Sequence, residues 1–193
     1  MFENLRAKME KSANSKWAVV TLMAVSFIES SFFPLPPDVI LIPMIILKKK
    51  KWVYYSVVCT AGSVVGGLVG YLIGYQFYNL LGVKLIGFYH AQHQFALVES
   101  FYRQYGFFAV FTAGFTPIPY KVFTIVAGVF KMNVASFTIA SIFGRGGRFL
   151  LEGFLIFKYG EKAVVFLEKH AILATILTIV LVILAVVLWK MWV

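Results

Sequence analysis

Six ionisable side chains lie within apolar segments of this sequence, where charge is costly. They are Glu29, Asp38, Lys121, Arg145, Arg148 and Glu152. Burying a charged group in a membrane or a dry core costs several kcal/mol, so such residues mark a substrate or proton pathway unless they only pair with one another. Acids there can take up and release protons, and arginine binds phosphate through a planar fork of donors. The residue types therefore indicate proton-linked handling of an anion.

Two proline-rich breaks interrupt the apolar segments around these charges. The first lies in "ESSFFPLPPD" between Glu29 and Asp38, and the second lies in "TPIPYK" just before Lys121. Proline removes a backbone donor and clashes with the preceding turn, and broken backbone at membrane depth is tolerated only inside protein or beside a water-filled cavity. Each break predicts a re-entrant hairpin, with tips at Pro34, Pro36, Pro37, Pro117 and Pro119.

The composition places the chain in a membrane. Of 193 residues, 61% are hydrophobic and 13% charged, with a mean hydropathy of +0.85, whereas about 25% charged residues is typical of soluble domains. The net charge of +10 is dispersed between apolar segments rather than gathered on one patch, which argues against nucleic acid as a partner. With Cys59 as the single cysteine, no disulfide framework exists.

These features predict an all-α integral membrane protein with two opposed re-entrant hairpins and about three transmembrane helices. The predicted parts are a basic cytoplasmic segment 1–16, a first repeat 17–80 (hairpin 17–47, transmembrane helix 52–77), an interfacial amphipathic connector 81–105, a second repeat 106–160 (hairpin 107–130, transmembrane helix 135–157) and a C-terminal transmembrane helix 170–193.

The two halves align with each other at an offset of 83 residues, which predicts an internal duplication. At this offset Pro34 falls on Pro117 and Asp38 falls on Lys121. A single span between two hairpins that do not cross makes the repeat inverted, as in many secondary transporters. We expect Asp38 and Lys121 at equivalent tips of the opposed hairpins, acid against base.

The basic residues predict the orientation. One side has the larger number of lysines and arginines: Arg6, Lys8, Lys11, Lys16, Lys48, Lys49, Lys50, Lys51, Lys158, Lys162 and Lys169. The other side has Lys84, Arg103, Lys131 and Lys190. The positive-inside rule then places the N-terminus in the cytoplasm and the C-terminus outside.

Spacing predicts how two of the longer helices are used. Arg145, Arg148 and Glu152 follow one another at i, i+3 and i+7, so they share a helix face. Glycines recur every fourth residue from Gly62 to Gly74, which favours close packing of another helix. No nucleophile paired with a base and no metal-ligand cluster is evident, so neither an enzyme, a metal site nor a cofactor is predicted.

At "ESSFFPLPPDVILIP" and "GFTPIPYKVFTIVAGVFKMNVASF" the chain resembles the DedA family of bacterial inner-membrane proteins, relatives of VTT-domain scramblases. The family's two acids around a proline-rich tip match Glu29 and Asp38. The second motif of the family has one arginine before a proline and another after it. In this chain Gly114 stands at the position of the first arginine, and Lys121 replaces the second.

The resemblance implies a lipid transporter of the bacterial inner membrane, with undecaprenyl phosphate as the lipid and protons as the coupled ion. In this hypothesis Glu29 and Asp38 carry protons, while Lys121, Arg145 and Arg148 bind the head group, the two arginines standing in for the family's missing ones. The sequence leaves three other functions open: a phospholipid scramblase, a proton-coupled cation antiporter, and a non-transporting assembly factor with purely structural charges. It also leaves open whether the chain forms a homo-oligomer.

Overall fold

The protein is helical throughout the part that the computed structural model describes, residues 17–31, 36–82, 88, 92–160 and 163. The helices are α2 (Ala18–Ser31), α3 (Asp38–Leu47), α4 (Trp52–Phe77), α6 (Gln92–Phe115), α7 (Tyr120–Val129) and α8 (Val134–Tyr159), with short turns η1 (Lys49–Lys51) and η2 (Tyr78–Gly82) on either side of α4. The all-α prediction is confirmed for this part. The predicted segment 1–16, Pro34 and the predicted C-terminal helix 170–193 lie outside the described residues.

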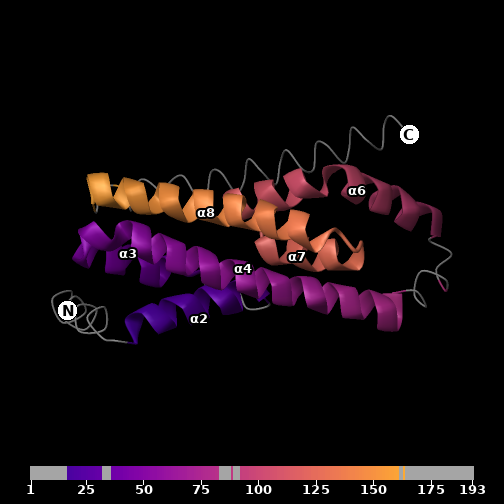
Figure 1. Ribbon diagram of the computed structural model, residues 1–193, viewed down its shortest axis with the longest axis horizontal. Coiled ribbons are helices and arrows are strands. Elements are labelled where there is room, and N and C mark those ends of the chain that lie inside the picture. Colours follow the sequence, from indigo (N-terminus) through magenta and orange to yellow (C-terminus); the bar gives the residue numbers. More distant parts are fainter. Residues whose placement is uncertain (1–16, 32–35, 83–87, 89–91, 161–162, 164–193) are drawn as a thin grey trace.

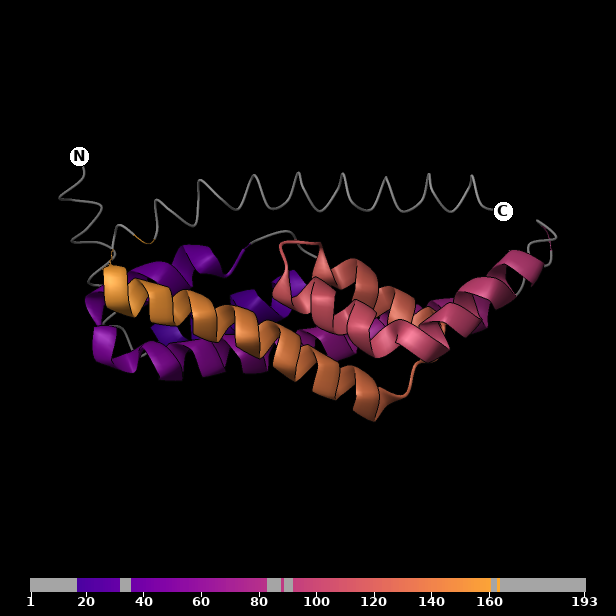
Figure 2. The same ribbon diagram turned by 90° about the horizontal axis from the view of Figure 1, so that it is seen from above.

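Helix α4 is the centre of the arrangement. It runs along the long axis of the molecule beside α8, with α2 packed along its first half and α7 along its second half (Figures 1 and 2). Helix α6 packs on α8, and α3 lies against both α8 and α4. The two long helices α4 and α8 therefore form the centre of the bundle, and α2, α3, α6 and α7 pack against them.

The long helices are long enough to cross a membrane. Each has 26 residues, or about 39 Å at 1.5 Å per residue, against a hydrocarbon core of about 30 Å. By length and composition, one stretch of the described chain, Lys49–Leu80, is apolar enough to span. Helix α8 matches the predicted span 135–157 in position, but its inward charges lower its hydropathy.

The helices stop at both predicted breaks. Helix α2 ends at Ser31 and α3 begins at Asp38, immediately after Pro37; α6 ends at Phe115 and α7 begins immediately after Pro119. Proline suits these positions because its fixed φ fits a helix start and its missing N–H is not needed there.

The predicted boundary between the connector and the second hairpin, at 105/106, is not present. Helix α6 runs without interruption from Gln92 to Phe115, so the second half of the predicted connector belongs to the helix that enters the second break. The polar residues that suggested an interfacial segment are compatible with a helix, since no proline falls among them and Glu99 pairs with Arg103 one turn later at 3.0 Å.

Glycines let α4 approach helices on two sides. A Cβ at Gly66 would collide with the Phe27 carbonyl of α2, and one at Gly74 would collide with the Ile125 carbonyl of α7. Such backbone-to-backbone contact needs residues without side chains. Serines complete the seam with α2, where Ser26 Oγ donates to the Cys59 carbonyl at 2.6 Å. The predicted glycine stripe thus serves two packing surfaces.

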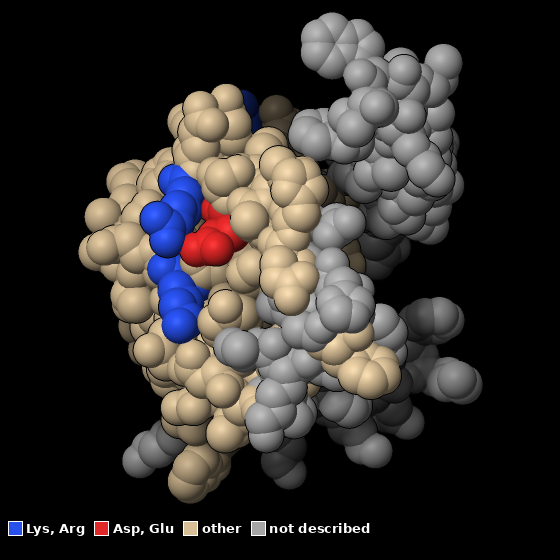
Figure 3. Space-filling model, turned by 90° about the vertical axis from the view of Figure 1, so that its right-hand side faces the viewer, with Lys and Arg blue, Asp and Glu red and all other residues tan. Residues whose placement is uncertain are grey.

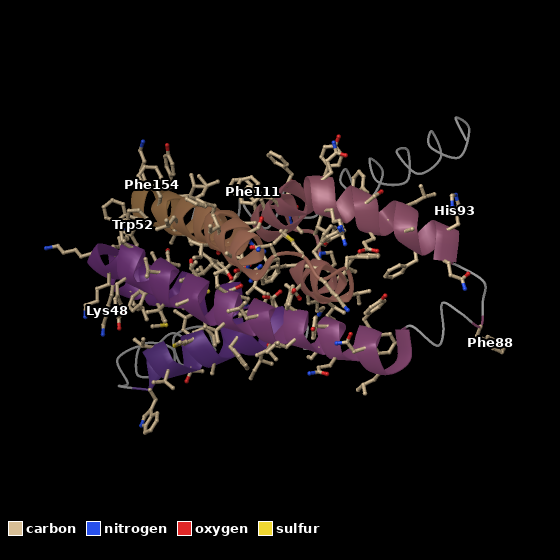
Figure 4. The ribbon with its side chains drawn as sticks, turned by 45° about the vertical axis from the view of Figure 1, so that its right-hand side comes forward. Lys48, Trp52, Phe88, His93, Phe111 and Phe154 are labelled. Atoms are coloured by element: carbon tan, nitrogen blue, oxygen red, sulfur yellow. The ribbon has the colours of Figure 1, made fainter. Side chains whose placement is uncertain are left out.

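The two ends of the bundle differ in charge. Lys48 and Trp52 lie at one end near Phe154, and His93 lies at the other (Figure 4). Trp52 stacks on Phe157 at 5.9 Å, so the basic run before α4 adjoins the end of α8. At the end where α6 begins, a small group of basic and acidic side chains interrupts a described surface that is otherwise mostly uncharged (Figure 3).

We predict that Gly74→Ala destabilises the protein much more than Gly146→Ala. The added methyl group at Gly74 meets fixed backbone of α7, which costs about 1–3 kcal/mol, whereas at Gly146 it would meet only the Thr60 side chain at an ordinary 3.5 Å. Thermal unfolding of the purified variants in detergent micelles measures the difference. Equal melting temperatures would show that α4 and α7 are not in close contact.

Candidate functional site

The inward face of α8 carries the buried charge. The side chain of Arg145 is only 1% exposed, and its Nη2 donates to Glu29 Oε2 of α2 at 2.6 Å. Its guanidinium also lies between two rings, 5.1 Å from the Tyr120 centroid and 4.7 Å from that of Phe149. Cation–π contact and an opposite charge together compensate for the loss of water.

Two serines close this pair into a ring of hydrogen bonds. Arg145 Nε donates to Ser63 Oγ at 2.5 Å, Ser63 and Ser30 share a hydrogen bond of 2.7 Å, and Ser30 Oγ donates to Glu29 Oε2 at 3.0 Å. A hydroxyl has one proton to donate, so Ser63 must be the donor to Ser30. Two routes of hydrogen bonds then lead from the guanidinium to the carboxylate, one direct and one through Ser63 and Ser30. The ring joins α2, α4 and α8.

A second pair lies where α3 begins. Arg148 Nη2 donates to Asp38 Oδ2 at 2.6 Å, and both side chains are about a quarter exposed (27% and 24%). The other carboxylate oxygen, Asp38 Oδ1, is buried and has no hydrogen-bond partner within the described chain. This pair is more open than the Arg145 pair, and its acid has unused acceptor capacity.

Both breaks face one hollow of about 250 Å³, which we call the polar hollow. Its lining combines the two proline segments with two cations and an acid: Pro36, Pro37, Pro117, Ile118, Pro119, Lys121, Arg148 and Glu29. The side chain of Lys121 borders the hollow and forms no hydrogen bond or ion pair with any described residue. Among the described residues, the hollow is thus lined by one cation without a side-chain partner, Lys121, and by one that pairs with Asp38, Arg148.

The structure brings together most residues that the sequence singles out, with one change of partner. Asp38 pairs with Arg148, and the expected opposition of Asp38 to Lys121 is wrong as a pairing, because α8 passes closer to the start of α3 than α7 does. Arg145, Arg148 and Glu152 do share the inward face of α8. Glu152 is buried there and forms no hydrogen bond or ion pair with other described side chains.

Sequence reasoning missed the neutral members of the site. Ser30, Ser63 and Tyr120 carry no charge, so hydropathy gives them no weight. A usable signal was present in the spacing, since Ser26 and Ser30 are four residues apart and Ser56 and Ser63 seven, which places each pair on one helix face. Tyr120 is 1% exposed, and its hydroxyl has no partner within the described chain.

Comparison with known proteins identifies the family. The model of the VTT domain matches residues 35–158, which include both long helices, the second break and every charged residue of the site except Glu29. The chain belongs to the VTT-domain (DedA) family. It is therefore a membrane protein with a transport-related role.

Relatives of this VTT-domain protein cover most of its length. An uncharacterised protein of Haemophilus influenzae is 40% identical over 88% of both chains, and one of Histophilus somni is 36% identical over 84% of both. A more distant relative from Methanocaldococcus jannaschii is 28% identical over 64% of this chain and 74% of its own. No solved structure matches the chain significantly.

We predict that Arg145→Met lowers stability by about 3–5 kcal/mol, because it leaves the Glu29 carboxylate, only 18% exposed, without its cation. The double variant Glu29→Gln with Arg145→Met should recover part of this loss. Chemical unfolding in micelles gives the coupling energy. Glu99→Gln, at the exposed Arg103 pair, is the control and should cost about 0.5 kcal/mol or less; a similar cost for Arg145→Met would contradict a structural ring.

Proposed function

We propose that this VTT-domain protein moves an anionic lipid, undecaprenyl phosphate, across the bacterial inner membrane, and that proton uptake and release by Asp38 is coupled to this movement. The observation that carries the proposal is the polar hollow, where a free cation, Lys121, and a second cation, Arg148, meet two backbone breaks. A phosphate monoester carries about 1.5–2 negative charges at neutral pH, which two cations can neutralise.

We further propose that the chain is an inverted repeat, with this hollow between its two equivalent halves. Moving α3 and α4 along the chain by 83 residues gives 121–130 and 135–160, within one residue of the observed bounds of α7 and α8. The contacts also correspond, since α2 packs on α4 as α6 packs on α8, and α7 packs on α4 as α3 packs on α8. This correspondence supports two opposed re-entrant hairpins, whose alternate opening would expose the hollow to either side.

Asp38 is the better placed of the two acids to couple protons to the lipid. Glu29 Oε2 already accepts from both Arg145 and Ser30, whereas Asp38 holds Arg148 through one oxygen and leaves the other free. Protonation of Asp38 would release Arg148, which can then bind phosphate beside Lys121. Proton binding and anion binding thereby favour each other, because both states avoid an unpaired charge.

The orientation follows from the charged end of the bundle. Lys48–Lys51 adjoin the end of α8, which carries Lys158 in its last turn. Under the positive-inside rule this end would face the cytoplasm, and we propose a cytoplasmic N-terminus and an external C-terminus on this basis.

A non-transporting assembly factor is the second candidate, because the closed ring around Arg145 is a structural use of charge. An exchange of partners, Asp38→Arg with Arg148→Asp, separates the two. If the pair only holds helices together, the exchange should restore the activity that each single variant loses. If Arg148 also binds the lipid, the exchange should restore stability without activity.

We predict gradient-driven movement of undecaprenyl phosphate in liposomes that contain the purified protein. Lys121→Met should slow it by about tenfold or more, the equivalent of losing one charged hydrogen bond, and Asp38→Asn should abolish its dependence on the pH gradient. Lys131→Met is the matched control, since Lys131 lies over the Tyr78 ring, 4.9 Å from its centroid, and does not border the hollow.

The alternatives give distinct outcomes in the same liposomes. Movement of phospholipid and undecaprenyl phosphate alike without a gradient would indicate a scramblase. Cation flux against protons without any lipid movement would indicate an antiporter, and no flux at all would favour the assembly factor. Equal loss of transport in Lys131→Met and Lys121→Met would contradict a specific role for Lys121.

A further inference from the structure

A second hollow, of about 350 Å³, lies between α6 and α7 beside the second break. Its walls include three aromatic residues of α6, Phe101, Tyr105 and Phe108, and small residues such as Ala109, and no charged residue lines it. We call it the apolar hollow. Ile118 lines both this hollow and the polar hollow, so the two share a wall at the tip of the second break.

Within the described residues, the corresponding place in the first half of the chain is closely packed at several positions. The positions 83 residues before its lining include Ala18, Leu22, Ser26 and Ser30, all of which are buried between helices. On the α6 side, in contrast, Phe101, the counterpart of Ala18, is 51% exposed. The described parts of the two halves therefore differ in packing at this place.

We infer that the apolar hollow binds the head-proximal part of the single hydrocarbon chain of a lipid phosphate whose phosphate lies in the polar hollow. The inference rests on the proposed function and adds to it where the chain is held. The adjacency through Ile118 supplies the amphipathic geometry, with cations on one side of this residue and aromatic rings on the other. The volume falls within the range of about 300–1,000 Å³ that is usual for ligand sites.

One hollow for a chain beside one hollow for a phosphate favours a lipid with a single chain. A diacyl lipid carries two chains next to its phosphate, and only one of them would enter the apolar hollow. The site would thus select polyprenyl phosphate over phosphatidic acid by the number of chains, in addition to the charge of the head group.

Filling the apolar hollow tests this inference. Ala109→Phe should lower the rate of undecaprenyl phosphate movement in liposomes by about tenfold, since overpacking or displacement of the chain costs on the order of 1–3 kcal/mol. Val122→Phe adds a similar ring on the exposed face of α7, outside both hollows, and should leave the rate unchanged. Thr112→Leu is a second filling variant, and melting temperatures identify any variant that fails to fold.

The outcomes separate this inference from the function on which it rests. Normal transport by folded Ala109→Phe and Thr112→Leu would overturn the chain site and leave the proposed function standing, as would equal transport of dioleoyl phosphatidic acid by the wild type. A wild type that moves no lipid phosphate would overturn both. A photoreactive undecaprenyl phosphate, with the reactive group in its first isoprene unit, should label residues 101–123; labelling confined to other segments, or to a second copy of the chain, would overturn the chain site.

Discussion

The pairing of two arginines of α8 with two acids of the first broken helix is the constraint on which the rest of the structure depends. Charged groups at this depth must be compensated within the protein. Glu29 and Asp38 lie on opposite sides of the first break, and α8 supplies Arg145 and Arg148 one turn apart, so each side of the break is held by its own ion pair. The two ion pairs therefore fix the helices on both sides of the break to α8.

The two pairs differ in what they leave available. The inner pair, Arg145 with Glu29, is joined by the hydroxyls of Ser30 and Ser63 into a ring of hydrogen bonds. Such a satisfied network gives rigidity. The outer pair, Arg148 with Asp38, is partly exposed, and one carboxylate oxygen of Asp38 has no hydrogen-bond partner among the described residues. Arg148 also lines the polar hollow together with Lys121. Because the Arg145 ring holds the helices in place, a ligand can replace Asp38 as the partner of Arg148 without disturbing the fold.

The sequence predicted those parts of the structure that depend on local patterns. The bounds of α4 and α8, the breaks after Ser31 and Phe115 and the common face of the α8 charges follow from apolar length, proline and helical spacing. The partner of Asp38 could not be predicted in this way, because it depends on where α8 crosses α3. The hydroxyls of the ring and the apolar hollow also depend on packing between distant segments, which leaves no mark in hydropathy.

The central claim is that the polar hollow receives an anionic lipid head group, and protection of a thiol there tests it most directly. Ile118→Cys, combined with Cys59→Ala to remove the buried native thiol, places a reactive group on the wall of both hollows. A water-soluble maleimide should label it, and undecaprenyl phosphate, but not uncharged undecaprenol, should slow the labelling. Labelling at the same rate with and without the phosphate lipid would contradict the account.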